Sequence, residues 1–435
     1  MSQDRSYDES LKLYRKAIDL IPGGSQTNSK RPTAFALGAF PIYAQDAEGA
    51  RVQDVDGNWY IDYVLGLGPI TLGYCYPAVD EAIREQLDRG ITYGLLSPLE
   101  VEVAEQITEM IPCAEMMRFL KGGAEVTQAA ARMARTFTGK PMILNSGYRG
   151  WADTWRAQGA GIEGGVPEPL GDLIDGWTRY DLDSLAAKLE EHAGQVAMVA
   201  LDPASGGDTV PAEYHEGVRE LCDDHDALLM YDEIVTGFRM AAGGGQEYFG
   251  VTPDLACFAK GIANGMPLGV VCGRADVMST AFDETVISVT YGGEALSLAA
   301  ARATMRIYAN EPVIDSIWDT GRTLTQGFER LAERHDVPLK CHGYAPMSSQ
   351  TIDYENPELS ADVWTLLLQE MARRGVLLRR GGLLFITYSH GDEEIEETLS
   401  ALDESLAVIA EAVDRDTVKD HLRVTEVEES FRSFA

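Results

Sequence analysis

The feature that most constrains this chain is a long alternation of short apolar runs with segments of helical periodicity. It begins near Met117 and continues to residue 272. Short buried runs predict strands, and the longer amphipathic or Ala-rich segments between them predict helices. The predicted strands are residues 117–120, 141–144, 196–201, 227–231, 255–258 and 268–272, with helices at about 124–137 and 212–226. Repeated βα units predict an α/β fold, with a mostly parallel sheet and helices on both faces.

The two ends of the chain predict a second, smaller α/β domain. Residues 7–20 have helical periodicity, and residues 51–63 predict a β-hairpin whose turn contains Asp56-Gly57. After residue 312, amphipathic helices alternate with short strands. We therefore expect an N-terminal segment that contributes to the small domain, a large domain, and a C-terminal small domain, at residues 1–70, 71–311 and 312–435.

The composition excludes several classes of protein. The formal net charge of −33 gives a surface that repels phosphate backbones, so we expect no nucleic-acid partner. No apolar run is long enough to span a membrane, and the polar N-terminus does not resemble a signal peptide, so we expect a cytoplasmic protein. The six cysteines include no CxxC pair, which argues against a metal cluster or a disulfide framework. An acidic surface is also typical of a salty cytoplasm, an alternative that we leave open.

Two residues in the alternating region carry the strongest chemical signal. Asp232 directly follows a predicted strand, and Lys260 follows the next one in a glycine-rich, apolar segment. Ligands of open α/β sheets bind at the carboxyl ends of the strands, so both side chains are expected at the binding edge. A lysine amine that forms a Schiff base and an acid that keeps a pyridine nitrogen protonated are the two anchors of pyridoxal 5'-phosphate (PLP). The pair therefore predicts a PLP site.

Two further features are consistent with a flat, phosphorylated cofactor. Gly122-Gly123-Ala124 lies between a predicted strand and a predicted helix, where bare backbone N–H groups bind anions. The alternative is an ordinary strand–helix turn. Tyr148 follows the next strand and has an aromatic ring suited to stacking on the cofactor, although a tyrosine at the rim of the core is the simpler interpretation. Asp232 and Glu233 have no histidine or further carboxylate at ligand spacing, so we expect no metal site.

These segments resemble class III (fold type I) PLP-dependent aminotransferases, and among them the glutamate-1-semialdehyde 2,1-aminomutase-like branch. The resemblance extends from Pro22 to His390. It is most specific in the motifs at residues 232–239 (DEIVTGFR) and 259–265 (AKGIANG). It implies that Lys260 is the Schiff-base lysine and the proton shuttle, and that Asp232 pairs with the pyridinium nitrogen.

The resemblance also implies the remaining cofactor contacts and the assembly. Ile234 and Tyr148 pack on the two faces of the ring, and the phosphate is held by backbone N–H groups of the Gly122-Gly123-Ala124 turn. Thr290 reaches the phosphate bound by the neighbouring subunit. The family is built as homodimers with shared active sites, so a homodimer is implied.

The chain departs from the family pattern at positions that touch the substrate. Relatives often have Ser-Gly-Thr-Glu-Ala, Tyr-His-Gly and Gly-Gly-Asn-Pro where this chain has residues 122–126 (GGAEV), 148–150 (YRG) and 292–295 (GGEA). Arg149 and Lys30 are the candidates for binding a substrate anion, since arginine grips a carboxylate through two parallel bonds. A surface ion pair is the alternative for both.

The resemblance leaves two activities open. One is an aminotransferase that moves an amino group from an amino-acid donor to a carbonyl acceptor, such as a keto acid, an aldehyde or a keto sugar. The other is an aminomutase that moves an amine within one molecule. The altered substrate positions favour the aminotransferase. A third interpretation, a PLP-fold protein kept only as a binding module, is disfavoured by the presence of Lys260, Asp232 and Tyr148 together.

Overall fold

The computed structural model describes residues 5–157, 164–205, 207–211 and 213–423. The chain forms two compact units. The first contains residues 1–76, 205–209 and 315–435, and the second contains residues 77–204 and 210–314. Among the described residues, no helix combines the length and the apolar character needed to cross a membrane.

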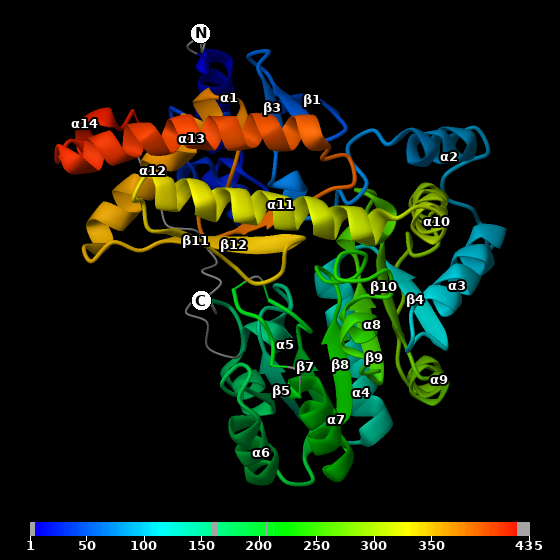
Figure 1. Ribbon diagram of the computed structural model, residues 1–435. Coiled ribbons are helices and arrows are strands. Elements are labelled where there is room, and N and C mark those ends of the chain that lie inside the picture. Colours follow the sequence, from blue (N-terminus) through cyan, green and yellow to red (C-terminus); the bar gives the residue numbers. More distant parts are fainter. Residues whose placement is uncertain (1–4, 158–163, 206, 212, 424–435) are drawn as a thin grey trace. The chain divides into compact units, whose positions relative to one another are not determined.

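The second unit is built on a seven-stranded sheet in the order β4-β10-β9-β8-β7-β5-β6 (Figure 1). Strands β5 to β9 pair in parallel, whereas β10 is antiparallel to both of its neighbours. The strands are β4 (Met116–Leu120), β5 (Met142–Ser146), β6 (Ile174–Asp175), β7 (Val196–Leu201), β8 (Leu228–Asp232), β9 (Leu255–Phe258) and β10 (Gly269–Gly273). Every residue of β5, β7, β8, β9 and β10 is buried, so both faces of the sheet are covered.

The helices of this unit pack on the sheet and around its edge. Helix α4 packs along β7 to β10, and α7 packs on β8. The helices are α2 (Pro77–Leu87), α3 (Pro98–Met110), α4 (Gly123–Thr138), α5 (Asp153–Arg156), α6 (Leu182–Glu191), α7 (Tyr214–Asp224), α8 (Gly245–Phe249), α9 (Ala275–Glu284) and α10 (Ala295–Asn310), with 3₁₀ turns at Glu168–Leu173 and Lys260–Ala263. The alanines of α4 let it lie close to the sheet, and its buried face forms the core together with Ile143, Met198 and Met230.

The first unit combines both ends of the chain. Strand β3 (Trp59–Asp62) pairs antiparallel with β2 (Arg51–Asp54) and parallel with β13 (Val376–Leu377), which lies more than 300 residues later. The turn between β2 and β3 is held by Asp54, whose Oδ1 accepts from the backbone N–H of Asn58 at 2.8 Å. The other strands are β1 (Ala44–Glu48), β11 (Leu339–His342), β12 (Met347–Ile352) and β14 (Leu383–Phe385). The helices are α1 (Asp8–Leu20), α11 (Val313–Arg334), α12 (Pro357–Arg373), α13 (Asp392–Asp414) and α14 (Val418–His421).

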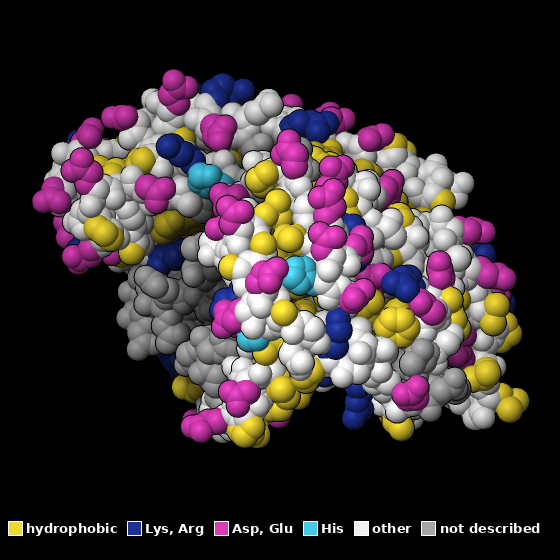
Figure 2. Space-filling model, turned by 90° about the horizontal axis from the view of Figure 1, so that it is seen from below, with side chains coloured by type: hydrophobic (Ala, Val, Ile, Leu, Met, Phe, Trp, Pro, Cys, Tyr) yellow, Lys and Arg dark blue, Asp and Glu magenta, His cyan; other side chains and the backbone are white. Residues whose placement is uncertain are grey.

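Acidic side chains outnumber basic ones on the face shown in Figure 2. This agrees with the whole sequence, in which 69 Asp and Glu stand against 36 Lys and Arg.

Candidate active site

The register of three parallel strands brings two carboxylates to one edge of the sheet. Ser146 of β5 lies opposite Leu201 of β7, and Leu201 lies opposite Tyr231 of β8. The residues that follow Leu201 and Tyr231 are Asp202 and Asp232. Both side chains therefore reach the carboxyl edge at the same level, which is where open α/β sheets bind ligands.

Asp232 is held in a defined orientation by two donors. It is buried, with 5% of its surface exposed. Its Oδ1 accepts from the backbone N–H of Ile234 at 3.1 Å, and its Oδ2 accepts from Nη1 of Arg149 at 3.3 Å. Burial raises the pKa of Asp232 to about 6, the Arg149 guanidinium opposes that rise, and the Asp202 carboxylate adds to it. Lys260 also favours the ionised form, which places its ammonium near this carboxylate.

Lys260 begins a 3₁₀ turn immediately after β9, with a backbone φ of 49°. A non-glycine residue in this left-handed region costs roughly 1–2 kcal/mol. Such strain is concentrated at functional sites, where the surrounding structure holds the residue in place. The parallel pairing of β8 and β9 puts Lys260 on the same edge as Asp232.

The start of helix α4 provides an anion site. The side chain of Glu125 accepts from the backbone N–H of Gly122 at 3.0 Å, which leaves the next two N–H groups, of Gly123 and Ala124, without an acceptor among the described residues. A Cβ on Gly123 would lie 2.7 Å from Cδ1 of Ile234, so a larger residue there would displace the end of the Ile234 side chain. Free N–H groups at a helix N-terminus are suited to a phosphate group.

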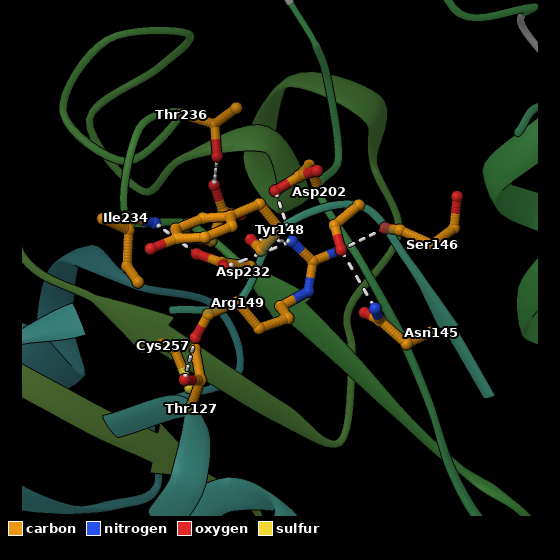
Figure 3. Close-up of polar contacts among 12 residues, drawn as sticks. Thr127, Asn145, Ser146, Tyr148, Arg149, Asp202, Asp232, Ile234, Thr236 and Cys257 are labelled. Atoms are coloured by element: carbon orange, nitrogen blue, oxygen red, sulfur yellow. Dashed lines mark hydrogen bonds and ion pairs between the residues drawn. The ribbon is translucent and has the colours of Figure 1, made fainter. Parts of the chain in front are cut away.

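Two apolar or aromatic side chains extend over the region next to Asp232. Figure 3 shows Tyr148 and Ile234 directed toward it. Tyr148 is 40% exposed, so part of its surface is accessible to a ligand. Thr290 is exposed in the turn that precedes α10.

The residues of this edge fit a flat, phosphorylated pyridine cofactor. Gly123 and Ala124 offer N–H groups for the phosphate, Asp232 offers a buried carboxylate for the ring nitrogen, and Lys260 offers an amine. All of them belong to the second unit. Their fit rests on unused donors and on the space that Gly123 leaves, independently of any sequence motif.

The side chain of Arg149 contacts other groups of the protein, whereas the sequence predicted that it binds a substrate anion. Its side chain is 0% exposed. Nη1 donates to Oδ1 of Asp202 at 2.6 Å, to the carbonyl of Tyr148 at 2.8 Å and to Asp232, and Nη2 donates to the carbonyl of Ser146. Figure 3 shows the guanidinium between the two carboxylates. A buried group with these four acceptors does not present a free edge to a substrate.

Asp202 is the site residue that sequence reasoning missed. It accepts from Arg149 through Oδ1 and from Nη2 of Arg179, at 3.3 Å, through Oδ2. Gly147 is required beside it, because a Cβ there would lie 2.4 Å from Oδ2 of Asp202 and 2.7 Å from Nη2 of Arg179. One signal was available: Asp202 follows a predicted buried strand, just as Asp232 does.

Lys30 lies in the first unit, at the end of the 3₁₀ turn Asn28–Lys30, and is exposed. Its ammonium opposes the rise in pKa that burial causes at Asp62 of the same unit. An exposed lysine next to a buried carboxylate is compatible with either of its expected roles, a substrate contact or an ion pair.

Comparison with known proteins identifies the family. The family model for class III aminotransferases matches residues 34–159 and 168–406. The chain belongs to the class III aminotransferases. Among curated members of this family, glutamate-1-semialdehyde 2,1-aminomutase of Syntrophobacter fumaroxidans is 34% identical over 91% of this chain and 96% of its own length. The 3-aminobutyryl-CoA aminotransferase of Cloacimonas acidaminovorans is 33% identical over 94% of this chain and 99% of its own length.

Solved structures of the class III family share the fold. The FumI protein of Sphingopyxis sp. MTA144, solved with PLP, is 27% identical, with a TM-score of 0.88 over 94% of this chain and 98% of that one. An omega-transaminase from Sphaerobacter thermophilus is 25% identical, with a TM-score of 0.83 over 92% of this chain and 98% of that one. The chain therefore has the fold of the fold type I PLP-dependent transferases, as the resemblance predicted.

Proposed function

We propose that this class III family member is a PLP-dependent aminotransferase that moves an amino group from an amino-acid donor to a carbonyl acceptor. One observation carries the proposal. Three features lie together in one unit, at the carboxyl edge of its sheet. They are a lysine in a strained backbone conformation, a buried carboxylate, and two N–H groups with no acceptor among the described residues. The family match and the PLP bound to the related FumI protein support the choice of cofactor.

The proposed roles follow from where each group lies. Gly123 and Ala124 bind the phosphate through N–H groups that already point outward from the helix start. Asp232 keeps the ring nitrogen protonated, because a buried carboxylate stabilises a facing cation strongly. Tyr148 and Ile234 enclose the ring. When bound, PLP supplies an electron sink for the charge left at the substrate Cα after its proton is removed.

Lys260 is proposed to move that proton. Its amine serves as the base that takes the proton from the substrate Cα and as the acid that returns it at C4′ of the cofactor. Ile262 and Ala263 of the same turn are fully buried, which fixes the backbone from which the half-buried Lys260 side chain extends.

An intramolecular aminomutase is the second candidate. Several curated relatives of comparable identity are named glutamate-1-semialdehyde 2,1-aminomutase, whereas another is named an aminotransferase. Both activities use the same cofactor groups. Gly122, Ala124 and Ala295 stand where relatives often have serine, threonine and proline, which favours a different substrate and therefore the aminotransferase.

We also propose a homodimer, in which Thr290 contacts the phosphate held by the neighbouring subunit. Leu95 and Leu96 are each 86% exposed, and Tyr291, beside Thr290, is 59% exposed. The bond of 2.8 Å from the N–H of Ala295 to the carbonyl of Ile91 joins these two segments, so their apolar side chains belong to one region of the surface. Apolar surface of this kind is suited to a second copy.

Light scattering of the purified protein tests the assembly, and cell fractionation tests the cytoplasmic location that we propose from the composition.

The activity is tested by adding single amino donors to the purified, PLP-loaded protein. We expect one donor to remove the visible absorption band of the cofactor and to release its keto acid, and Lys260→Ala to abolish both effects. If no donor acts, but the protein as isolated carries pyridoxamine phosphate and converts glutamate 1-semialdehyde, the aminomutase is established instead. Full turnover by Lys260→Ala would refute both.

A further inference from the structure

A single buried guanidinium lies between two carboxylates at the proposed cofactor edge. Arg149 contacts Asp202 and Asp232 through the same nitrogen, Nη1. Its backbone is fixed as well, since Oγ1 of Thr127 donates to the carbonyl of Arg149 at 2.6 Å. The guanidinium is therefore held from both ends, and the carboxylates that it contacts are held with it.

Asp202 and Asp232 do not share the guanidinium of Arg149 equally. Nη1 lies 2.6 Å from Oδ1 of Asp202 but 3.3 Å from Oδ2 of Asp232. The first distance is that of a strong charge-assisted bond, and the second is that of a longer and weaker hydrogen bond. Asp202 thus takes most of the charge of Arg149, and Asp232 keeps most of its own negative charge.

We propose that Arg149 and Asp202 form a positioning pair, in which Arg149 fixes the direction of Asp232 while Asp202 prevents Arg149 from neutralising it. The proposal rests on the proposed role of Asp232 at the ring nitrogen. A histidine would gain and lose a proton near neutral pH, whereas the arginine at position 149 stays charged. A permanent cation at this position requires a permanent counter-ion, and Asp202 supplies it.

The charged or titratable groups that face Asp232 are few. Arg149 and Asp202 act on it from the ends of β5 and β7, Lys260 from the end of β9, and the Cys257 thiol lies within β9. Burial raises the pKa of Cys257 far above neutral, so the thiol stays uncharged. The charge of Asp232 is therefore set by Arg149, Asp202 and Lys260.

The decisive variant is Asp202→Asn, which keeps the shape of the side chain and removes its charge. The full charge of Arg149 then falls on Asp232, so the ring nitrogen is held less strongly. We expect the Kd of the apoprotein for PLP to rise about tenfold, kcat to fall about tenfold, and the donor KM to stay within about twofold. The pH at which the cofactor absorption band changes should also shift. These quantities do not respond to a loss of stability alone.

A second variant keeps the test valid if Asp202→Asn folds poorly because Arg149 has lost its counter-ion. Arg149→Met in the Asp202→Asn background removes the cation and its counter-ion together, leaving Asp232 as a single carboxylate. We expect this double variant to bind PLP more tightly than Asp202→Asn alone, because the effects of coupled charges are not additive. Asp254→Asn is the matched control. Asp254 is a buried carboxylate that pairs with two arginines at the amino end of β9, away from the carboxyl edge of the sheet. Its replacement should leave PLP binding unchanged.

Three results would overturn the inference. Native PLP affinity and kcat in Asp202→Asn would show that Asp202 has no effect on Asp232. A double variant that binds PLP no better than the single one would reduce the pair to structural support. Arg149 variants with native PLP affinity and a raised donor KM would make Arg149 a substrate ligand. If Asp232→Asn itself leaves the cofactor absorption unchanged, the proposed role of Asp232 fails, which is a separate outcome.

Discussion

The paired strands β8 and β9 have one buried aspartate at their amino end, Asp254, and one at their carboxyl end, Asp232. The negative charges of these two aspartates are compensated in opposite ways. At the amino end, Asp254 accepts from Arg219 at 2.8 Å and from Arg274 at 2.7 Å, so one carboxylate meets two guanidinium groups. At the carboxyl end, Asp232 shares one guanidinium with Asp202.

The difference separates a structural charge from a functional one. Asp254 is fully compensated, and its Oδ2 also accepts from the backbone N–H of Leu229 at 2.7 Å, which ties β9 to β8. Nothing remains for a ligand. Asp232 is buried with less positive charge around it, an arrangement that is costly for an empty protein and favourable once a cation arrives. Burial alone therefore does not identify a site, whereas incomplete compensation does.

The largest effect is expected at the carboxyl end. Asp232→Asn should reduce kcat about 100-fold, because a charge-assisted bond to the ring nitrogen is replaced by a neutral one worth about 3 kcal/mol less. The melting temperature of the apoprotein should stay the same or rise, since the cost of a buried charge is removed. Steady-state kinetics and calorimetry measure the two quantities. An active variant that melts earlier would make Asp232 structural, like Asp254.

The reverse result is expected at the amino end. Asp254→Asn removes one of the two carboxylates that each arginine contacts and should lower the free energy of unfolding by about 2 kcal/mol. Asp223 and Asp276 still pair with the arginines, and water offsets part of the loss because both arginines are partly exposed. Turnover per folded molecule should not change. Urea unfolding and activity assays check this, and a selective loss of activity would contradict the comparison.

Glu233 is a third buried carboxylate, and its charge is compensated by neutral hydrogen-bond donors. Its carboxylate accepts from Oγ1 of Thr236 and from the backbone N–H groups of Gly245, at 2.8 Å, and Gln246, at 2.9 Å. Burial nevertheless raises the pKa of Glu233 to about 7, from an ordinary value of 4.5.

The pH dependence follows from the sign of that shift. Between pH 4.5 and pH 7 the folded chain holds a proton that the unfolded chain has lost, so the contribution of Glu233 to stability falls as the pH rises. Glu233→Gln should lack this fall, and its free energy of unfolding should gain about 3 kcal/mol relative to the native protein across that window. Unfolding curves at several pH values measure the difference. A constant difference would mean that Glu233 has an ordinary pKa.

The smallest effect is expected from salt. The exposed carboxylates repel one another and are screened by ions, whereas buried pairs are screened much less. We expect the melting temperature of the native protein to rise by about 5 °C in molar KCl, with the destabilisation by Asp254→Asn almost unchanged. A melting temperature that does not rise would show that the acidic surface is not an adaptation to salt.

The sequence predicted those parts of the fold in which local pattern and tertiary packing agree. Strands β7 and β9 have the predicted limits, and helix α4 begins one residue before the predicted start. Strand β6, with only two residues, carries no periodicity that a pattern could reveal. Strand β14 is also short, because only Leu383, Leu384 and Phe385 pair with β12.

The site was predictable where a single residue carries the signal, and not where the signal lies in a contact. Asp232 and Lys260 stand out by their place after strands. The partners of Arg149 do not, because they depend on the register of β5, β7 and β8, which aligns residues about 50 and 80 positions apart in the chain. A buried arginine and a substrate-binding arginine look the same in a sequence.

The left-handed backbone of Lys260 bears on how this chain can evolve. Asparagine and glycine adopt that conformation at lower cost, so stability alone would favour either of them at position 260 by roughly 1 kcal/mol. The proposed catalytic role of Lys260 accounts for the lysine at this position. In a duplicated gene released from selection for that role, this position would be among the first to drift. Its product would fold better than its ancestor and catalyse nothing.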